Sequence, residues 1–240
     1  MLHKPKIQVF SGPPRSCKTN VMEFFDNYEH AFKSLKFTAE RVYNIDETGV
    51  STIVESRNIF AQIWTKQFRK DVSCERRAVI TACMIISSVG NTVPPVFIFP
   101  TRLNDSLMLG ALPRRLELVY SPQSSWVTGP LFLRVLEHVK KYTRSSKEDR
   151  IILLMDSHES HCTLDSIQYA RENGITLVTF PPHCCHRLQT LGVGVMGPFK
   201  GKLRVAQHNW LTANPGNVTI IHDLVSLTNA NISFLLLRRI

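Results

Sequence analysis

Short apolar runs alternate with segments of helical spacing along the central part of this chain. Runs rich in Ile, Val and Phe that end in turn-forming residues are typical of strands buried on both faces of a sheet. The pair Gly90-Asn91 separates two of these runs at the spacing of a hairpin turn. Strands are therefore predicted at residues 41–46, 78–87, 93–99, 151–155 and 176–180.

Helices are predicted before and between these strands. Thr128-Gly129-Pro130 has the composition of a helix start, and the apolar residues that follow it to Val139 form one stripe. A second helix is predicted at residues 164–172, and the basic lead-in up to Thr38 also carries apolar residues at helical spacing. This alternation of strands and helices predicts one α/β domain.

Two acids follow predicted strands. Asp46 closes the strand at residues 41–46, and Asp156 follows the apolar run Ile151–Met155. Open α/β sheets build their sites beyond the carboxyl ends of such strands. Two carboxylates from neighbouring strands would supply half of a divalent-metal cage. The alternative for each Asp is a simple cap on the following turn or helix.

Four ordered motifs extend this interpretation from about Phe24 to about Gly216. The motifs are Val42–Gly49, Val93–Pro100, Leu154–His161 and Phe180–Gln189. Together they resemble the pogo/Tigger type of DDE transposase domain. The resemblance implies an RNase H-like fold, a mixed β-sheet flanked by helices, in which three acids hold two Mg²⁺ or Mn²⁺ ions. In that family the ions serve hydrolysis and strand transfer at DNA phosphodiesters.

Two of the family's three acids have counterparts in this chain. The resemblance assigns the first to Asp46 and the second to Asp156, as catalytic residues and metal ligands. The third falls in the segment Leu188–Val195, where Gly192 occupies its position. The loss of one ligand weakens and misplaces at least one ion, so we expect cleavage to fall about 10²-fold or more.

No neighbouring carboxylate is a convincing substitute for the missing acid. The sequence has no Asp or Glu between Glu172 and Asp223. Glu47 directly follows the first acid, so on a strand its side chain points to the opposite face. Glu159 and Asp165 lie after the second acid, on its loop and on the following helix.

The chain is basic, with 29 Lys and Arg against 19 Asp and Glu and a formal net charge of +10. Such an excess favours a polyanionic partner through phosphate contacts and counterion release, although a basic solvated surface is the simpler alternative. The stretch from Asn173 to His222, which has no Asp or Glu, concentrates this positive charge. This favours DNA as the partner. The residues expected to bind nucleic acid are Arg187, Lys200, Lys202 and Arg204, with His183, His186 and His208 nearby.

The segment Gly12–Thr19 follows an apolar stretch and nearly copies a phosphate-binding loop. Cys17 replaces the second glycine of that motif, and Pro13 and Pro14 have no N–H to offer a phosphate. An irregular basic lead-in is therefore the preferred interpretation.

His and Cys residues also gather at residues 158–162 and 183–186. Four such side chains can bind Zn²⁺ when they converge as a tetrahedron. Adjacent cysteines and a short His-x-x-His are poor ligand spacing, and the histidines recur in the motifs above. Hydrogen-bonded loop histidines are therefore preferred to a structural Zn²⁺ site.

The six cysteines show no disulfide framework, and the N-terminal residues lead into no signal-peptide apolar region. A reduced compartment is expected, no segment long enough to span a membrane is expected, and the resemblance implies the nucleus.

The predicted domain covers residues 39–212. A basic lead-in at residues 1–38 precedes it, and a truncated, divergent C-terminal tail at residues 213–240 follows it.

These observations predict a transposable-element-derived domain that binds DNA and has lost most or all metal-dependent cleavage. Pogo/Tigger-type transposases carry N-terminal helix-turn-helix modules, which are not expected here, so a degraded or domesticated copy is the favoured interpretation. Two alternatives stay open. One is a residual Mg²⁺- or Mn²⁺-dependent DNA endonuclease with an unassigned third ligand. The other is a protein-interaction domain that recruits a partner through Phe234–Leu237.

Overall fold

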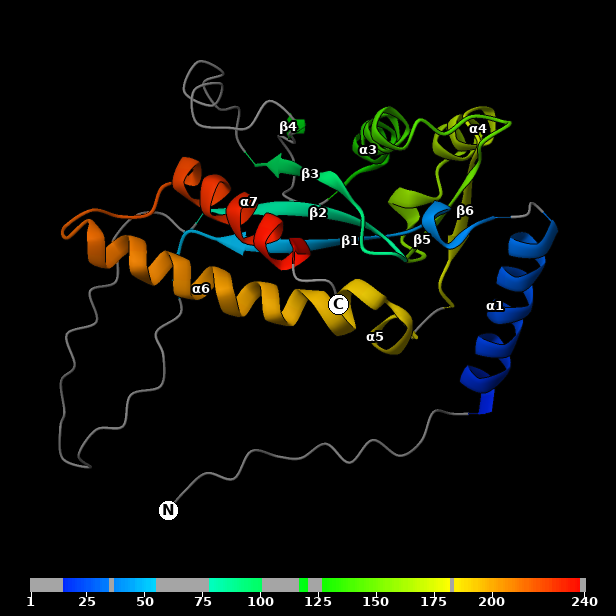
Figure 1. Ribbon diagram of the computed structural model, residues 1–240, viewed down its shortest axis with the longest axis horizontal. Helices are drawn as coiled ribbons and strands as arrows, with labels where there is room; N and C mark the ends of the chain where they lie inside the picture. Colours follow the sequence, from blue (N-terminus) through cyan, green and yellow to red (C-terminus); the bar gives the residue numbers. More distant parts are fainter. Residues whose placement is uncertain are drawn as a thin grey trace.

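Six strands form one mixed sheet in the computed structural model, which describes residues 15–34, 37–54, 78–100, 117–120, 127–181 and 184–237. The strand order is β4-β3-β2-β1-β5-β6, and helices cover both faces (Figure 1). Five strands lie where the sequence predicts them, and β4 is an addition. Their bounds are β1 (Val42–Ser51), β2 (Val79–Ser87), β3 (Thr92–Phe99), β4 (Glu117–Tyr120), β5 (Ile151–Met155) and β6 (Ile175–Thr179).

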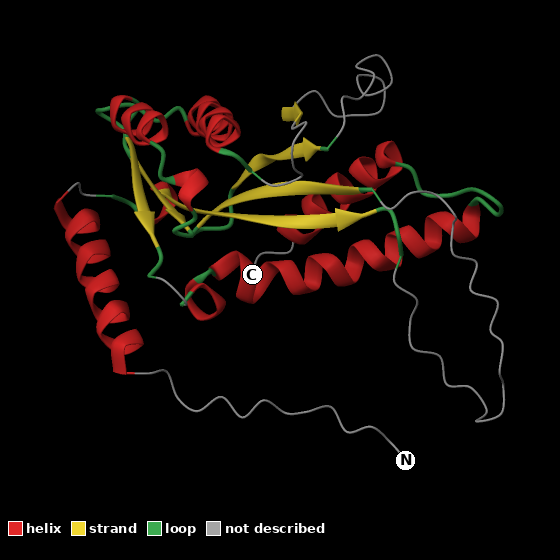
Figure 2. Ribbon diagram, turned by 180° about the vertical axis from the view of Figure 1, so that it is seen from behind, coloured by secondary structure: helices red, strands yellow, loops and turns green. Residues whose placement is uncertain are grey.

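Antiparallel pairing on one side and parallel pairing on the other meet at β1 (Figure 2). β1, β2 and β3 are antiparallel neighbours, and the predicted turn between β2 and β3 contains Gly90 with a φ of 87°. β5 pairs with β1, and β6 with β5, in parallel, while β4 joins the far edge in parallel with β3. Parallel pairing needs long crossover connections, and α4 (Leu164–Glu172) lies in the one between β5 and β6.

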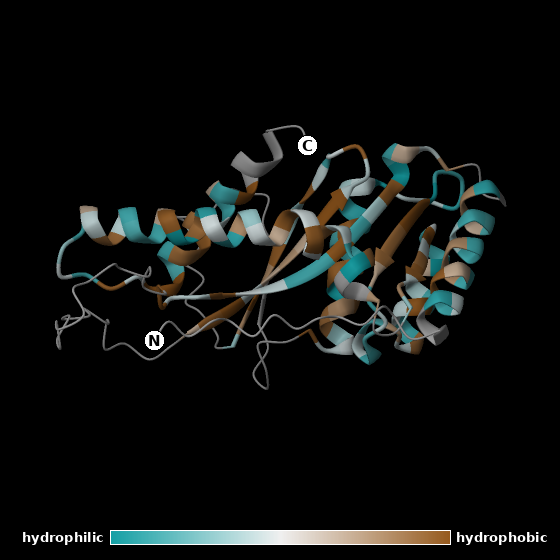
Figure 3. Cartoon of the chain, turned by 90° about the horizontal axis from the view of Figure 1, so that it is seen from below, coloured by the Kyte–Doolittle hydropathy of each residue, from teal (hydrophilic) through white to brown (hydrophobic). Residues whose placement is uncertain are grey.

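Alternation along the strands sends side chains into two cores on opposite faces of the sheet. Cys83 and Ile85 of β2 belong to the core under α3 and α4, whereas Ala82 and Met84 belong to the core under α6 and α7. Most strands are accordingly apolar, and the outer helices carry both kinds of residue (Figure 3). The helix bounds are α1 (Arg15–Ser34), α3 (Gly129–Thr143), α4 (Leu164–Glu172), α5 (Cys185–Leu188), α6 (Met196–Ala213) and α7 (Ile221–Leu237).

The helices α6 and α7 have no counterpart among the sequence-based predictions. α6 buries Met196, Phe199 and Leu203 at helical intervals, so a signal for it is present in the sequence. α7 buries Leu224 in the same core. Packing therefore continues beyond the predicted domain boundary at residue 212. The side chains of Phe234–Leu237, which one alternative treats as a docking tail, lie outside the described part of the chain.

The lead-in contributes α1, which packs on the sheet through one aromatic stripe. Phe24, Tyr28 and Phe32 follow one another at four-residue intervals, and Tyr28 and Phe32 pack on a small core that includes Val42. Phe24 lies against Phe180, just after β6, with the ring centroids 5.4 Å apart. Of the segment that resembles a phosphate-binding loop, residues 12–14 lie outside the described part.

β1 is longer than predicted. It continues to Ser51, so Asp46 lies in the middle of the strand and the expectation that this acid ends the strand is wrong. The pairing with β2 extends from Tyr43 to Ser51. The second half of the strand was not predicted because it contains polar residues such as Thr48. Backbone pairing holds these residues in the strand, and it does not require apolar side chains.

Arg41, just before β1, forms hydrogen bonds to the end of α3 and to the segment between α3 and β5. Its guanidinium donates to the carbonyl oxygens of Thr143 at 2.9 Å and Asp149 at 2.7 Å. Gly174 packs against the same segment, since a Cβ on it would lie 1.8 Å from the carbonyl oxygen of Ser146. With a φ of 70° as well, this position suits only glycine.

Replacing Gly174 by Ala should lower the free energy of unfolding by well over the roughly 1–2 kcal/mol that a left-handed backbone costs an L-residue. Gly216→Ala is the matched control, because Gly216 has a φ of 83° but nothing lies within 4 Å of its Cβ position. Urea denaturation of both variants measures the difference. Equal losses of stability in the two variants would contradict the steric account.

Candidate active site

The two predicted acids lie near each other, at the point where β1 loses β5 as a neighbour. Asp156 directly follows β5. β1 pairs with β5 only from Val42 to Asn44, so Asp46 lies just beyond the last paired residues. Both carboxylates are therefore at the carboxyl end of β5, and their charges interact.

Gly192, at the third motif position, lies beside Asp46. A Cβ atom on Gly192 would be 3.4 Å from Oδ2 of Asp46 and 3.5 Å from Cγ of Gln189. The glycine belongs to a π-helical turn, Leu191–Val195, that leads directly into α6. The fold thus brings the three motif positions together, with no side chain at the third.

A buried pair of amide side chains connects this segment to β1. Nδ2 of Asn44 donates to Oε1 of Gln189 at 2.6 Å, and Nε2 of Gln189 donates to the carbonyl oxygen of Ile45 at 3.0 Å. Oδ1 of Asn44 accepts from the N–H of Leu191 at 3.0 Å. Neither amide is predicted as a site residue from the sequence. The available signal was that Asn44 shares a strand face with Asp46.

Asp46 is a half-buried acid with a raised pKa. Burial raises the pKa of Asp46 to about 6, and the negative charges of Glu47 and Asp156 add to this effect. Hydrogen bonds from the Glu47 N–H, at 2.9 Å, and from the Gln189 side chain act in the opposite direction. With this pKa the carboxyl group of Asp46 is mostly ionised at neutral pH and becomes protonated as the pH falls through about 6.

His161, at the end of the short 3₁₀ turn η2 (Glu159–His161), joins Glu47 to Asp156. Its Nε2 lies 3.0 Å from Oε1 of Glu47, and its Nδ1 lies 2.6 Å from Oδ1 of Asp156. Nδ1 approaches away from the ideal hydrogen-bond direction, so the second contact is an ion pair. The imidazole also packs at a tilt against Phe132 of α3, with the centroids 4.4 Å apart. Glu47 therefore faces α3 and does not replace the missing acid.

These contacts make His161 a cation at neutral pH. Burial by itself lowers the pKa of His161, but the carboxylates of Asp156 and Glu47 outweigh burial and raise this pKa to about 9. In turn, the contact with His161 holds the pKa of Asp156 below its ordinary value. A side chain of the protein therefore supplies the positive charge next to the second acid.

The donors present do not form the three-acid cage that the resemblance implies. Asp46 and Asp156 are the two carboxylates that could hold a cation, but the third position has no side chain and Asp156 is already paired with His161. Within the described residues, no group of three or more His, Cys, Asp or Glu side chains is placed to hold a metal ion. His183 and the side chains of Cys185 and His186 lie outside those residues.

The residues predicted to bind DNA lie on α5 and α6. Arg187, Lys200 and Arg204 are exposed, and Lys202 is half-buried. Lys200, Arg204 and His208 follow one another at four-residue intervals, so they share one side of α6. Lys202 lies on a different side of the helix, and the predicted basic face is therefore narrower than the sequence suggests.

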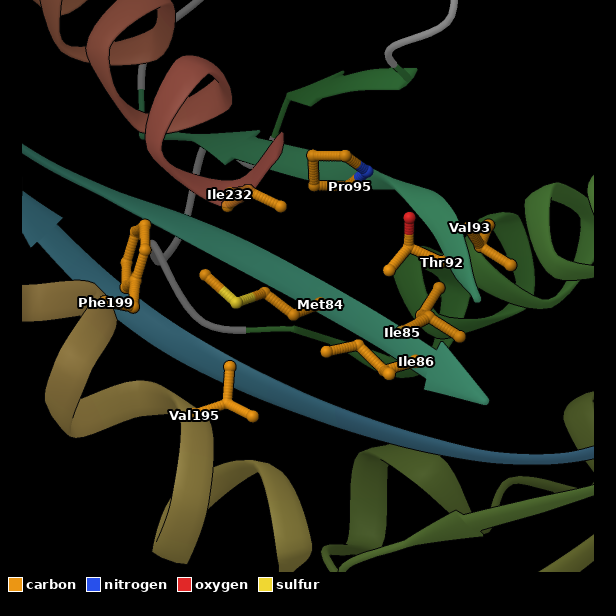
Figure 4. Close-up of a pocket in the computed structure, with 9 residues that line it drawn as sticks. All are labelled: Met84, Ile85, Ile86, Thr92, Val93, Pro95, Val195, Phe199 and Ile232. Carbon is orange, nitrogen blue, oxygen red and sulfur yellow. The ribbon is translucent and has the colours of Figure 1, made fainter. Parts of the chain in front are cut away.

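A small apolar cavity lies between the sheet and the helices α6 and α7 (Figure 4). Met84, Val195, Phe199 and Ile232 are among the residues that line it. Its volume of about 10 Å³ is comparable with the space that a single water molecule needs. We therefore regard it as a packing gap and not as a ligand site.

Comparison with protein families identifies the chain. The family described as DDE superfamily endonuclease matches residues 75–231, which is more than half of the sequence. The chain therefore belongs to the DDE superfamily endonucleases, and the resemblance drawn from the motifs is confirmed. The matched region includes Asp156 and Gly192, and it begins after Asp46.

A curated relative is the MFS-type transporter clz9 of Cochliobolus lunatus. It is 30% identical over 164 residues, which cover 67% of this chain and 18% of that protein. The chain thus spans less than a fifth of the relative's length. In the part of the chain that the structure describes, no helix is long and apolar enough to cross a membrane.

Two solved structures show the same fold. The Mos1 mariner paired-end complex with Mn has a TM-score of 0.55 and 10% identity, and the match covers 99% of this chain and 64% of that one. The pre-cleavage Mos1 transpososome has a TM-score of 0.54 and 10% identity, with 99% and 65% covered. The chain therefore spans about two thirds of these proteins. At this identity the likeness concerns the fold, and it confirms the RNase H-like mixed sheet.

Raising the pH should weaken the fold through His161. Its pKa rises from the ordinary 6.5 to about 9 on folding, so its stabilising contribution is full below the lower value and is lost as the pH passes the higher one. We expect the free energy of unfolding to fall across this window, and to fall less in His161→Gln. Urea denaturation at several pH values measures this difference.

The Glu47→Gln variant is the companion experiment, because it removes one of the two carboxylates that raise the pKa of His161. An NMR titration of the ring should show a lower midpoint in this variant than in the native chain. A native midpoint near the ordinary value of 6.5 would contradict the proposed charge of His161.

Proposed function

We propose that this chain is a transposon-derived DDE domain that binds DNA and has lost most of its metal-dependent phosphodiester cleavage and strand transfer. The observation that carries the proposal is Gly192, which lies beside Asp46 where the family resemblance calls for a third acid. The sequence from Asn173 to His222 contains no Asp or Glu that could take its place.

The charges at the site support the same conclusion. Carboxylates that hold catalytic cations stay ionised because the cations neutralise them. Here Asp156 is already paired with His161, and residue 192 offers no side chain beside Asp46. Asp46 and Asp156 would be the ligands of Mg²⁺ or Mn²⁺ if either ion bound. Such an ion would have to compete with His161 and would lack the third carboxylate.

The proposed partner is DNA, contacted through Arg187 on α5 and the side of α6 that carries Lys200 and Arg204. The formal net charge of +10 supports this assignment. So does the fold, because another Mos1 structure with a TM-score of 0.53 is a paired-end complex with the left transposon end. The proposed compartment is the nucleus, which follows from the pogo/Tigger resemblance.

Nicking of supercoiled DNA in the presence of Mn²⁺ tests the loss of cleavage. We expect the native chain to be inactive and Gly192→Asp to nick DNA, with rates that differ by about 10²-fold or more. A new side chain has room, because its Cβ would be 3.4 Å from the nearest carboxylate oxygen of Asp46.

Gly194→Asp is the matched control for this experiment. It adds the same charge to the same π-helical turn, but nothing lies within 4 Å of its Cβ position, so it should stay inactive. Nicking by the native chain that disappears in Asp156→Asn would overturn the proposal and establish a working endonuclease with another third ligand.

Salt dependence tests the DNA interface. If Lys200 and Arg204 each neutralise a phosphate, replacing both by Ala should weaken binding to all sequences. The slope of log K against log salt should then become shallower by about 1 for each phosphate that is no longer neutralised. Fluorescence anisotropy with a labelled duplex measures both quantities. Arg134→Ala is the control, because Arg134 is an exposed cation on α3, on the opposite face of the sheet.

Binding that does not respond to salt would count against the phosphate contacts. A complete lack of DNA affinity at low salt would instead favour the protein-interaction alternative.

A further inference from the structure

The amide pair Asn44 and Gln189 is more thoroughly hydrogen-bonded than a chance packing contact requires. Both side chains are buried, with exposed fractions of 7% for Asn44 and 4% for Gln189. Besides its bond to Gln189, Nδ2 of Asn44 donates to the carbonyl oxygen of Leu154 at 3.0 Å. With the bonds to Ile45 and Leu191 described above, the pair joins β1, β5 and the π-helical turn.

Each of these bonds ends close to one of the three motif positions. Asn44 is two residues before Asp46 on the same strand face, and Leu154 is two residues before Asp156. Leu191 directly precedes Gly192, and the carbonyl oxygen of Gln189 accepts the Val193 N–H at 2.9 Å. A displacement of the pair would therefore move the three positions relative to one another.

The position of Gly192 depends on this pair more than on contacts of its own. Glycine has no side chain to hold it, and the three atoms nearest to its Cβ position belong to Asp46 and Gln189. The π-helical turn begins at Leu191, whose N–H is bonded to the Asn44 side chain. The amide pair thus fixes the first residue of the turn that carries the third position.

We propose that Asn44 and Gln189 are positioning residues that place residue 192 against Asp46. The location of the third position would then be held by two side chains that this chain contains, although the chain has no acid at that position. The inference rests on the proposed function only for naming residue 192 as the third position. Its test uses neither DNA nor metal, so the two proposals can fail separately.

The proximity of residues 46 and 192 can be measured directly in the full chain. The substitutions Asp46→Cys and Gly192→Cys introduce two cysteines that can form a disulfide when the two positions are close. A Cβ on Gly192 would lie 3.4 Å from Oδ2 of Asp46, so the two side chains point at each other and a disulfide is expected when residue 192 stays close to β1. The rate of its formation under mild oxidant is followed by peptide mapping, which distinguishes it from disulfides of the native cysteines. Adding Gln189→Met, which keeps the length of the side chain, should slow this rate by about tenfold or more.

Gln207→Met is the matched control. Gln207 is also a buried glutamine that donates to a β1 carbonyl, that of Ser51 at 2.8 Å, but it lies on α6 away from the site. It should weaken the fold without changing the rate of disulfide formation. The proposal would be overturned if disulfide formation were as fast with Gln189→Met as without it. It would also be overturned if Gln207→Met slowed disulfide formation as much as Gln189→Met does.

A second variant keeps the test decisive if Gln189→Met fails to fold, as judged by circular dichroism. Asn44→Ser removes the bonds to Gln189 and Leu191 from the opposite side of the pair. It should slow disulfide formation in the same way. If the Asn44→Ser variant folds and its rate of disulfide formation is unchanged, the proposal is refuted.

Discussion

The unequal pairing of β1 is the constraint on which both the fold and the site depend. β1 is paired with β2 along nearly its whole length but with β5 over only three residues. The early end of the second pairing leaves the strand edge open beside Asp46, where the segment around Gly192 packs. Because side chains alternate, Asn44 and Asp46 face this segment, whereas Ile45 and Glu47 face α3.

The two acids of the site are stabilised in different ways. Asp46 is half-buried with a raised pKa, and it receives hydrogen bonds from the Glu47 N–H and the Gln189 side chain. Asp156 has a cationic partner in His161, which Glu47 and Phe132 hold in place. The charge of Asp156, whose side chain is 41% exposed, is thus balanced by a cation that the protein itself supplies.

Several elements could be predicted because their signals are local. β5 is an uninterrupted apolar run, α3 begins at Gly129-Pro130, and the hairpin turn contains Gly90. The true end of β1 at Ser51 could not be predicted, because its polar residues are held by pairing with β2 and not by burial of apolar side chains. α6 was not predicted, although Met196, Phe199 and Leu203 have helical spacing, because glycines and a proline interrupt the apolar pattern at its start.

The sequence by itself determined the class of fold, and the resemblance of its motifs assigns two acids to Asp46 and Asp156 and the third position to Gly192. These properties depend on residue type and order, which the motifs record. The tertiary structure alone decided that Gly192 lies against Asp46, that His161 pairs with Asp156, and that Asn44 bonds to Gln189, 145 residues away in the chain. Contacts at such separation arise only when the sheet brings distant segments together, and no local pattern encodes their distances.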